Sequence, residues 1–200
     1  MNRKDITASL IIGGAVGLLL QPILANSFSH ANFSIVERIG IVIFFALFAP
    51  FALWIAYLLS KLWKGIYQFA QFAAVGTLNS FIDIGVFNLE TFLYGSSIIG
   101  TALFAVFKAI SFLCATTNSF AWNKYWTFKA TDKADAKQVS GFYGVAIIGW
   151  VVNVGVATLV KSIGPETKAW TNIVAPLGGI AVTFVWNYIG YKFWVFRKKA

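Results

Sequence analysis

The sequence is poor in the residues on which most soluble enzymes depend. Its 200 residues include one histidine, one cysteine and seven acidic residues. A Ser-His-Asp triad or a metal site cannot be assembled from one His and one Cys, and no Gly-rich phosphate loop of the Walker type occurs. Cys114 stands alone in an apolar segment, so a disulfide framework is excluded. We therefore expect no catalytic centre, no metal and no cofactor in this chain, which is not an enzyme on this interpretation.

Charge is equally scarce, and apolar residues take its place. Charged residues make up 12% of the chain and hydrophobic residues 58%, whereas ordinary globular chains are about 25% charged. Spanning the ~30 Å hydrocarbon layer takes about 20 apolar residues, and such segments recur near residues 6–25, 39–60, 68–91, 101–122, 139–160 and 169–191. The composition predicts an all-α, polytopic transmembrane helical bundle with six spans. We interpret the first apolar run as a retained helix and not a removed signal peptide.

The net charge of +9 is not interpreted as a nucleic-acid surface, because the basic residues gather where helices leave the bilayer. With a cytoplasmic N-terminus, twelve of them lie on the cytoplasmic side: Arg3, Lys4, Lys61, Lys64, Lys124, Lys129, Lys133, Lys137, Lys192, Arg197, Lys198 and Lys199. The other side then holds Arg38, Lys161 and Lys168. This asymmetry predicts a multi-pass protein of the cell membrane with both termini cytoplasmic and with basic surfaces that meet membrane lipids.

One stretch of the chain occurs twice, as residues 68–129 and 138–197. At an offset of seventy residues Phe72 meets Phe142, and at an offset of sixty-eight Lys124 meets Lys192 and Trp126 meets Trp194. Each copy is two apolar segments closed by an aromatic-basic ending, residues 124–129 or 192–197. Both copies start and finish on the cytoplasmic side, so we expect parallel repeats. The predicted domains are an N-terminal transmembrane hairpin, 1–64, and a four-helix domain, 65–200.

Asp83 and Lys108 are the charges nearest the middle of the bilayer. At 1.5 Å per residue each lies roughly 20–22 Å from the cytoplasmic end of its segment, so the two can pair. A charge at this depth costs about 2.5–3.5 kcal/mol on insertion scales and is a functional hypothesis by default. Two alternatives stay open: an ion pair that only fixes helix register, and a Lys108 that snorkels outward.

Five asparagines form a second candidate set: Asn79, Asn118, Asn123, Asn153 and Asn187. Their amides should face the bundle, either to hold helices together or to contact a sugar. Lys124 and Lys192, in the aromatic-basic endings, are interfacial anchors or receivers of a lipid phosphate. Asp83 aligns with Asn153 and Lys108 with Pro176, so the two copies are not chemically equivalent.

Two motifs carry a resemblance to a known family. The patterns Phe72-x-x-Val-Gly-x-x-Asn79-x-x-x-Asp83 and Asn118-Ser-Phe-x-x-Asn123-Lys-Tyr-Trp-x-Phe128, with Trp186-Asn187 and Lys192-Phe-Trp-Val-Phe196 in the second copy, resemble the GtrA-like family over about residues 67–198. The resemblance implies a flippase that moves a polyprenyl-phosphate-linked monosaccharide from the cytoplasmic to the outer leaflet, for cell-surface polysaccharide glycosylation by a glycosyltransferase partner. The substrate-binding candidates are then Asn79, Asp83, Lys108, Asn118, Asn123, Lys124, Asn153, Asn187 and Lys192.

Two other functions remain open at this point. One is a proton-coupled exporter of small solutes, in which Asp83 exchanges protons. The other is a non-transporting membrane scaffold for a glycosyltransferase. Four short helices make a thin wall around a sugar, so we expect a homo-oligomer or an open lateral groove. The extra hairpin, about residues 6–60, lies outside the duplicated unit, and we expect it to govern assembly or partner docking.

Overall fold

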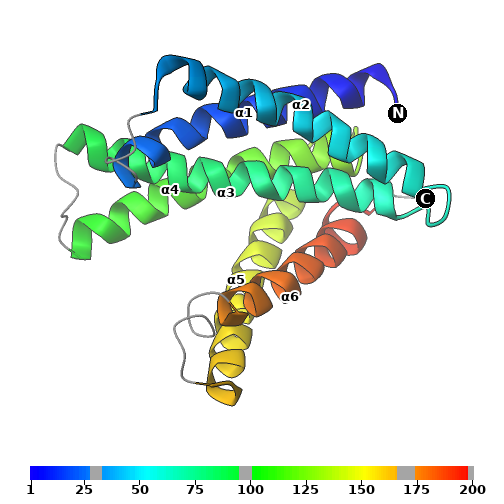
Figure 1. Cartoon of the computed structure of the whole chain (residues 1–200). Helices are drawn as coiled ribbons and strands as arrows, with labels where there is room; N and C mark the ends of the chain where they lie inside the picture. The colour runs from blue at the N-terminus through cyan, green and yellow to red at the C-terminus, as the bar shows by residue number, and fades with distance from the viewer. Residues whose placement is uncertain (28–32, 95–100, 166–173, 198–200) are drawn as a thin grey trace. The chain divides into compact units, whose positions relative to one another are not determined.

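The computed structural model describes residues 1–27, 33–94, 101–165 and 174–197, and all regular structure in these ranges is helical (Figure 1). The elements in chain order are α1 (Arg3–Ser27), α2 (Ile35–Leu59), α3 (Ile66–Tyr94), α4 (Thr101–Trp122), the π-helical turn η1 (Asn123–Thr127), α5 (Ala136–Ile163), α6 (Ala175–Gly190) and the π-helical turn η3 (Tyr191–Val195). Helices α1 to α5 are each long and apolar enough to cross a membrane, and α6 continues directly into η3. The predicted fold class, a polytopic helical membrane bundle, is confirmed.

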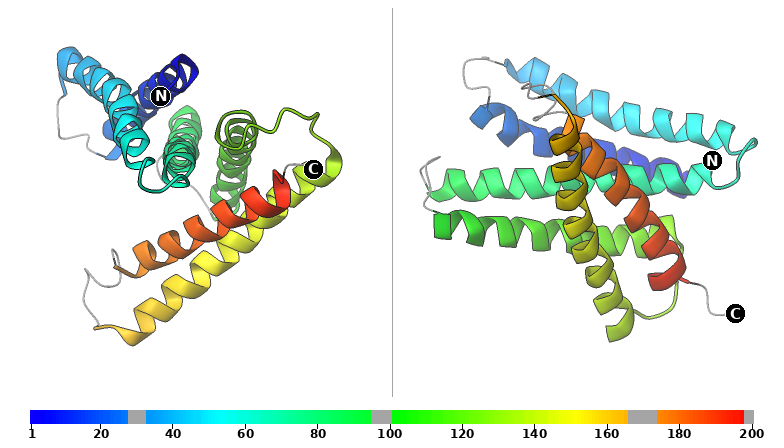
Figure 2. Two further views of the ribbon diagram at one scale, coloured as in Figure 1. Left: turned by 90° about the vertical axis from the view of Figure 1, so that its right-hand side faces the viewer. Right: turned by 90° about the horizontal axis from the view of Figure 1, so that it is seen from below.

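The chain forms two compact units. Unit 1 is Met1–Lys129 and unit 2 is Ala130–Ala200. In unit 1 the helices α1 to α4 run side by side along their length, and in unit 2 α5 and α6 form a hairpin (Figure 2). Packing therefore joins the N-terminal hairpin to the first copy of the repeat, whereas the boundary expected at residues 64–65 follows the limit of the duplicated sequence. That domain boundary, between the hairpin and the duplicated sequence, stays a prediction.

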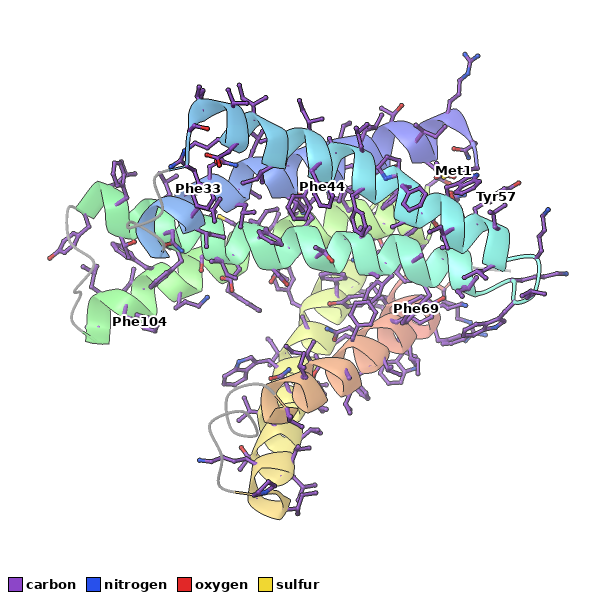
Figure 3. The ribbon with its side chains drawn as sticks, viewed as in Figure 1. Met1, Phe33, Phe44, Tyr57, Phe69 and Phe104 are labelled. Atoms are coloured by element: carbon purple, nitrogen blue, oxygen red, sulfur yellow. The ribbon has the colours of Figure 1, made fainter. Side chains whose placement is uncertain are left out.

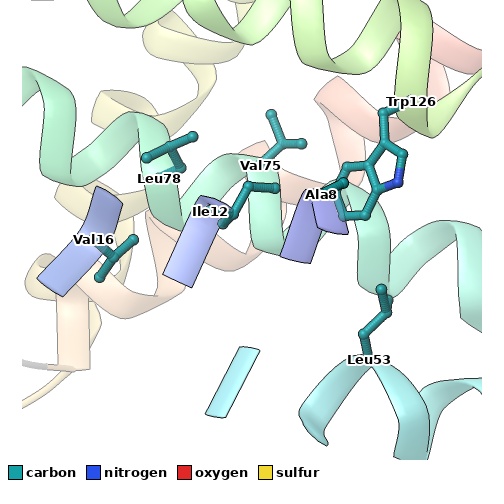
Figure 4. Packing of buried hydrophobic residues seen from close by; sticks show 7 residues of the cluster. All are labelled: Ala8, Ile12, Val16, Leu53, Val75, Leu78 and Trp126. Atoms are coloured by element: carbon teal, nitrogen blue, oxygen red, sulfur yellow. The ribbon is translucent and has the colours of Figure 1, made fainter. Parts of the chain in front are cut away.

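The core of unit 1 lies where the N-terminal hairpin meets the repeat. Its buried side chains come from three helices and one turn and interdigitate in a single cluster (Figure 4): Ala8, Ile12, Val16, Leu53, Val75, Leu78 and Trp126. Apolar burial gives no hydrophobic gain against lipid, so close van der Waals packing is what holds such helices together. The cluster shows that α1 is an integral part of the packing around α3.

Two glycines let α1 approach α2 closely. A Cβ atom added at Gly17 would lie 2.7 Å from the Cα atom of Val42, and one added at Gly13 would overlap the backbone carbonyl of Phe45. No larger side chain fits there without moving a helix. This close approach at two glycines one turn apart is typical of small-residue contacts between membrane helices.

Both copies of the repeat end in the same unusual turn. In η1 the amide of Phe128 donates to the carbonyl of Asn123 at 2.8 Å, and in η3 the amide of Phe196 donates to the carbonyl of Tyr191 at 2.8 Å. These bonds span five residues, one more than in an α-helix, and such turns recur at functional sites. The aromatic-basic endings that match in sequence therefore also match in backbone.

Side-chain contacts around these turns are duplicated as well. The amide of Gln68 donates to the Thr127 carbonyl at 3.2 Å, and the amide of Gln138 donates to the Val195 carbonyl at 3.4 Å. The equivalent ring pairs are Phe72 with Phe128, whose centroids lie 6.4 Å apart, and Phe142 with Phe196, at 6.0 Å. Each copy thus closes by fixing its turn against the start of its first helix.

The two ends of unit 1 differ in charge. Met1 and Tyr57 lie at one end of the unit, and Phe33 and Phe104 lie toward the other (Figure 3). The first end carries the start of α1, the end of α2, the start of α3 and η1, and with them the basic residues Arg3, Lys4, Lys61, Lys64, Lys124 and Lys129. Arg38, at the start of α2, belongs to the other end. This is the asymmetry that the positive-inside tendency uses, and we call this end of unit 1 the basic end.

Candidate functional site

An ion pair joins α3 to α4 near the middle of the α3 span. The Lys108 Nζ atom lies 2.9 Å from Oδ1 and 2.8 Å from Oδ2 of Asp83. The two side chains are 39% and 29% exposed, respectively, so the pair is open on one side. The direct pairing expected from the matched depths of the two residues is present. The contact lowers the cost of holding either charge within the hydrocarbon layer.

Ser111 completes the coordination of the carboxylate. Its hydroxyl donates to Oδ1 of Asp83 at 2.6 Å, and the residue is fully buried. It stands one turn beyond Lys108 on α4 and also contacts the Lys108 carbonyl, at 3.2 Å. Sequence reasoning missed Ser111, because serines are frequent in membrane spans. The signal that would have found it is its position three residues after Lys108, on the same face.

Phe87 lies on the side of the ion pair that faces away from the basic end. Its ring centroid is 5.6 Å from the Lys108 Nζ atom and 5.2 Å from the ring centroid of Phe104, in a T-shaped arrangement. A cation over an aromatic face is attracted by the ring quadrupole, more strongly where water is scarce. Sequence reasoning also missed this ring, although Phe87 follows Asp83 by four residues and so shares its face.

Asn79 extends the same face toward the basic end. It lies one turn before Asp83, and its side-chain oxygen accepts from the Asn118 amide at 2.7 Å. Read along α3, the interface carries Asn79, Asp83 and Phe87, each facing a partner on α4. We call this row of contacts the polar stripe. It brings together four of the nine candidates from the sequence: Asn79, Asp83, Lys108 and Asn118.

Asn123 and Lys124 lie in the turn η1, which follows the C-terminal end of α4 and so lies beyond the polar stripe. Both are buried, with exposures of 1% and 0%. The Asn123 amide donates to the Ser119 hydroxyl at 3.1 Å, whereas its side-chain oxygen is buried without a hydrogen-bond partner in the described part of the chain. The Lys124 Nζ atom is 5.8 Å from the ring centroid of Tyr125. In this structure the Lys124 side chain is open neither to the membrane surface, as an interfacial anchor would be, nor to a lipid phosphate.

The remaining candidates lie in unit 2, where the chemistry differs. A Cβ atom added at Gly179 would lie 2.6 Å from the carbonyl oxygen of Asn153, so the helices meet closely at the position that aligns with the Asp83–Ser111 contact. Asn187 packs against Gly149. Lys192 donates to the Tyr188 hydroxyl at 3.3 Å. Within unit 2 the described residues form no counterpart of the ion pair.

The fold and the polar stripe define a class: a multi-pass helical membrane protein with a charged, amide-bearing contact between two consecutive spans. The chain belongs to the family described as GtrA/DPMS, transmembrane domain, whose model matches residues 71–196, more than half of its length. It is also similar to the uncharacterized membrane protein YngA of Bacillus subtilis (strain 168), with 29% identity over 126 residues, 63% of this chain and 77% of that protein. No solved structure matches. The family resemblance drawn from the motifs is confirmed.

Proposed function

We propose that this protein is a translocase that moves a polyprenyl-phosphate-linked monosaccharide from the cytoplasmic to the outer leaflet. The family supports a membrane protein that handles lipid-linked sugars. The observation that carries the finer proposal is Lys108, a partly exposed cation held by Asp83 within the membrane-spanning part of the chain. A lipid phosphate crossing the bilayer needs a cation at this depth, because an isolated charge there is costly.

Lys108 is suited to exchanging one anion for another. An ammonium group on a flexible four-carbon stem carries three donors that can turn toward a new acceptor. In the resting arrangement two of its contacts are with the Asp83 carboxylate. When a phosphate takes that place, Asp83 keeps its hydrogen bond from Ser111 and Lys108 keeps its contact with Phe87. The ion pair is thus a binding site whose resting occupant is the protein's own carboxylate.

The amide pair gives a sugar something to bind beside the phosphate. An asparagine side chain offers two donors and an acceptor with two lone pairs, and the Asn79–Asn118 contact uses one donor and one acceptor. The remaining donors and acceptors of the two asparagines can hydrogen-bond to the hydroxyls of a monosaccharide, because each hydroxyl is both a donor and an acceptor. The lipid tail stays in the bilayer beside the apolar outer faces of the helices, which are exposed in this chain. A homo-oligomer and a glycosyltransferase partner remain part of this proposal.

The test is transport of a labelled polyprenyl-phosphate sugar into everted vesicles that contain the full chain. Lys108→Ala should lower the initial rate, and Lys64→Ala, a matched change at an exposed lysine of the basic end, should leave it near wild type. Lys108→Arg keeps the charge with a different donor geometry and should retain partial activity. Wild-type rates in Lys108→Ala would refute the proposal. Transport of other solutes that collapses with the pH gradient would favour an exporter, and co-purification of an enzyme without any transport would favour a scaffold.

A further inference from the structure

Asp5 is a buried carboxylate that the proposed transport mechanism does not use. It stands in the first turn of α1 and is 3% exposed. Its Oδ2 atom accepts from the Tyr67 hydroxyl at 2.9 Å. Its Oδ1 atom accepts from the Gln71 amide at 3.1 Å and from the Trp126 indole N–H at 3.0 Å. One side chain of the N-terminal hairpin therefore binds both the start of α3 and the turn η1.

The donors around Asp5 are neutral. Within the described ranges no basic side chain forms an ion pair with this carboxylate, whereas Asp83 has Lys108. A buried carboxylate is stable only when its oxygens are hydrogen-bonded, and three neutral donors meet that need here. The arrangement also satisfies the indole N–H of Trp126, which is buried in the core of unit 1 and would otherwise lack an acceptor.

The second copy of the repeat does not keep this set of donors. At the positions that align with Tyr67, Gln71 and Trp126 it has Lys137, Gly141 and Trp194. The indole is the one donor of the three that is kept, and Trp194 is 61% exposed where Trp126 is 8% exposed. The polar groups that receive Asp5 are thus specific to the copy on which the hairpin packs.

We propose that Asp5 is a positioning residue that fixes the turn η1, and with it Asn123 and Lys124, against the start of α3. Trp126 lies inside η1, two residues after Lys124, so a hydrogen bond that holds the indole also holds the backbone of that turn. The N-terminal hairpin then holds the conformation of η1 at the basic end, in addition to any role in assembly. A contribution of η1 to transport rests on the proposed function, but the positioning itself does not.

Equivalent positions in the two turns offer a direct test. Tyr125 in η1 and Phe193 in η3 align and are 63% and 55% exposed, so a spin label at either reports on its own turn. The experiment uses the full chain in lipid nanodiscs with Cys114→Ser, and Y125C or F193C for labelling. D5A should increase the label mobility at position 125 several-fold and leave position 193 unchanged. W126F should reproduce the effect at position 125, and W194F, its matched control, should not.

A neutral isostere separates hydrogen bonding from charge. In D5N the side-chain oxygen still accepts from Gln71 and Trp126, and the Tyr67 hydroxyl can rotate to accept from the new amide. In D5N the label at position 125 should therefore be less than half as mobile as it is in D5A. If D5A fails to give a monodisperse protein, the comparison of W126F with W194F decides. An immobile label at position 125 in D5A or W126F, or equal mobilisation at 125 and 193, would overturn the proposal. A turn mobilised by D5A, together with a wild-type protein that moves no lipid-linked sugar, would leave the positioning intact and refute the proposed function.

Discussion

Exchanging the two charges of the polar stripe distinguishes a phosphate site from a structural ion pair. In the double variant Asp83→Lys with Lys108→Asp, opposite charges still face each other between α3 and α4. A pair that only fixes helix register needs nothing more, so a structural role predicts a stable, active protein. A phosphate site predicts a stable but impaired protein, because the cation now stands on α3 without the Phe87 contact of the wild type, and Ser111 no longer donates to a carboxylate on α3.

The expected loss of transport rate follows from the hydrogen bonds that Lys108 makes. A hydrogen bond to a charged group contributes about 1.5–3 kcal/mol, which is roughly a 10- to 150-fold change in rate when it is lost from the transition state. We expect the transport rate of the exchanged variant to fall by a factor within this range. The transport rate of Lys108→Ala should fall by at least this factor, because the substitution also leaves the Asp83 carboxylate without its cation.

The assay combines transport with a measure of folding. Initial rates of lipid-linked sugar uptake are compared for the wild type, Lys108→Ala and the exchanged variant, each at the same amount of monodisperse protein, and thermal unfolding of each is followed in detergent. We expect the exchanged variant to unfold near the wild-type temperature and to transport at the rate of Lys108→Ala. If it instead transports as the wild type does, the phosphate role of Lys108 is wrong and the pair is structural.

Two further predictions concern packing and orientation. Gly17→Val should destabilise the hairpin, because its side chain would meet the α2 backbone, whereas Gly40→Val, at a site with no atom within 4 Å of an added Cβ, should be tolerated; equal thermal stabilities would contradict the close contact. With both termini cytoplasmic, a cysteine at Lys133, in a Cys114→Ser background, should resist membrane-impermeant maleimide in intact cells and react after lysis. Labelling of that position in intact cells would contradict the orientation.

The placement of the spans and the pairing of Asp83 with Lys108 could be predicted from the apolar runs and the charges of the sequence. Apolar runs fix where spans form, and matched depth along two antiparallel spans was enough to pair Asp83 with Lys108. The contacts that sequence reasoning missed are those that depend on helix rotation and long-range packing. Ser111 is one polar residue among many until the face of α4 is known, and the contact of Asp5 with Trp126 joins residues that are 121 positions apart in the chain. The π-helical turns likewise have no periodic signature; the repeated ending marked their place but not their geometry.

The unequal chemistry of the two repeats has a consequence for stoichiometry. The fold is present twice, but the position of Asp83 is held by Asn153 in the second copy and that of Lys108 by Pro176, while Gly179 brings the helices together at the position that aligns with Ser111. Duplication thus supplied a second pair of spans without a second cation at the position of Lys108. Saturation with a phosphate-bearing lipid should therefore reach one molecule per polypeptide, and an assembly of several chains should carry as many substrates as it has copies of Lys108.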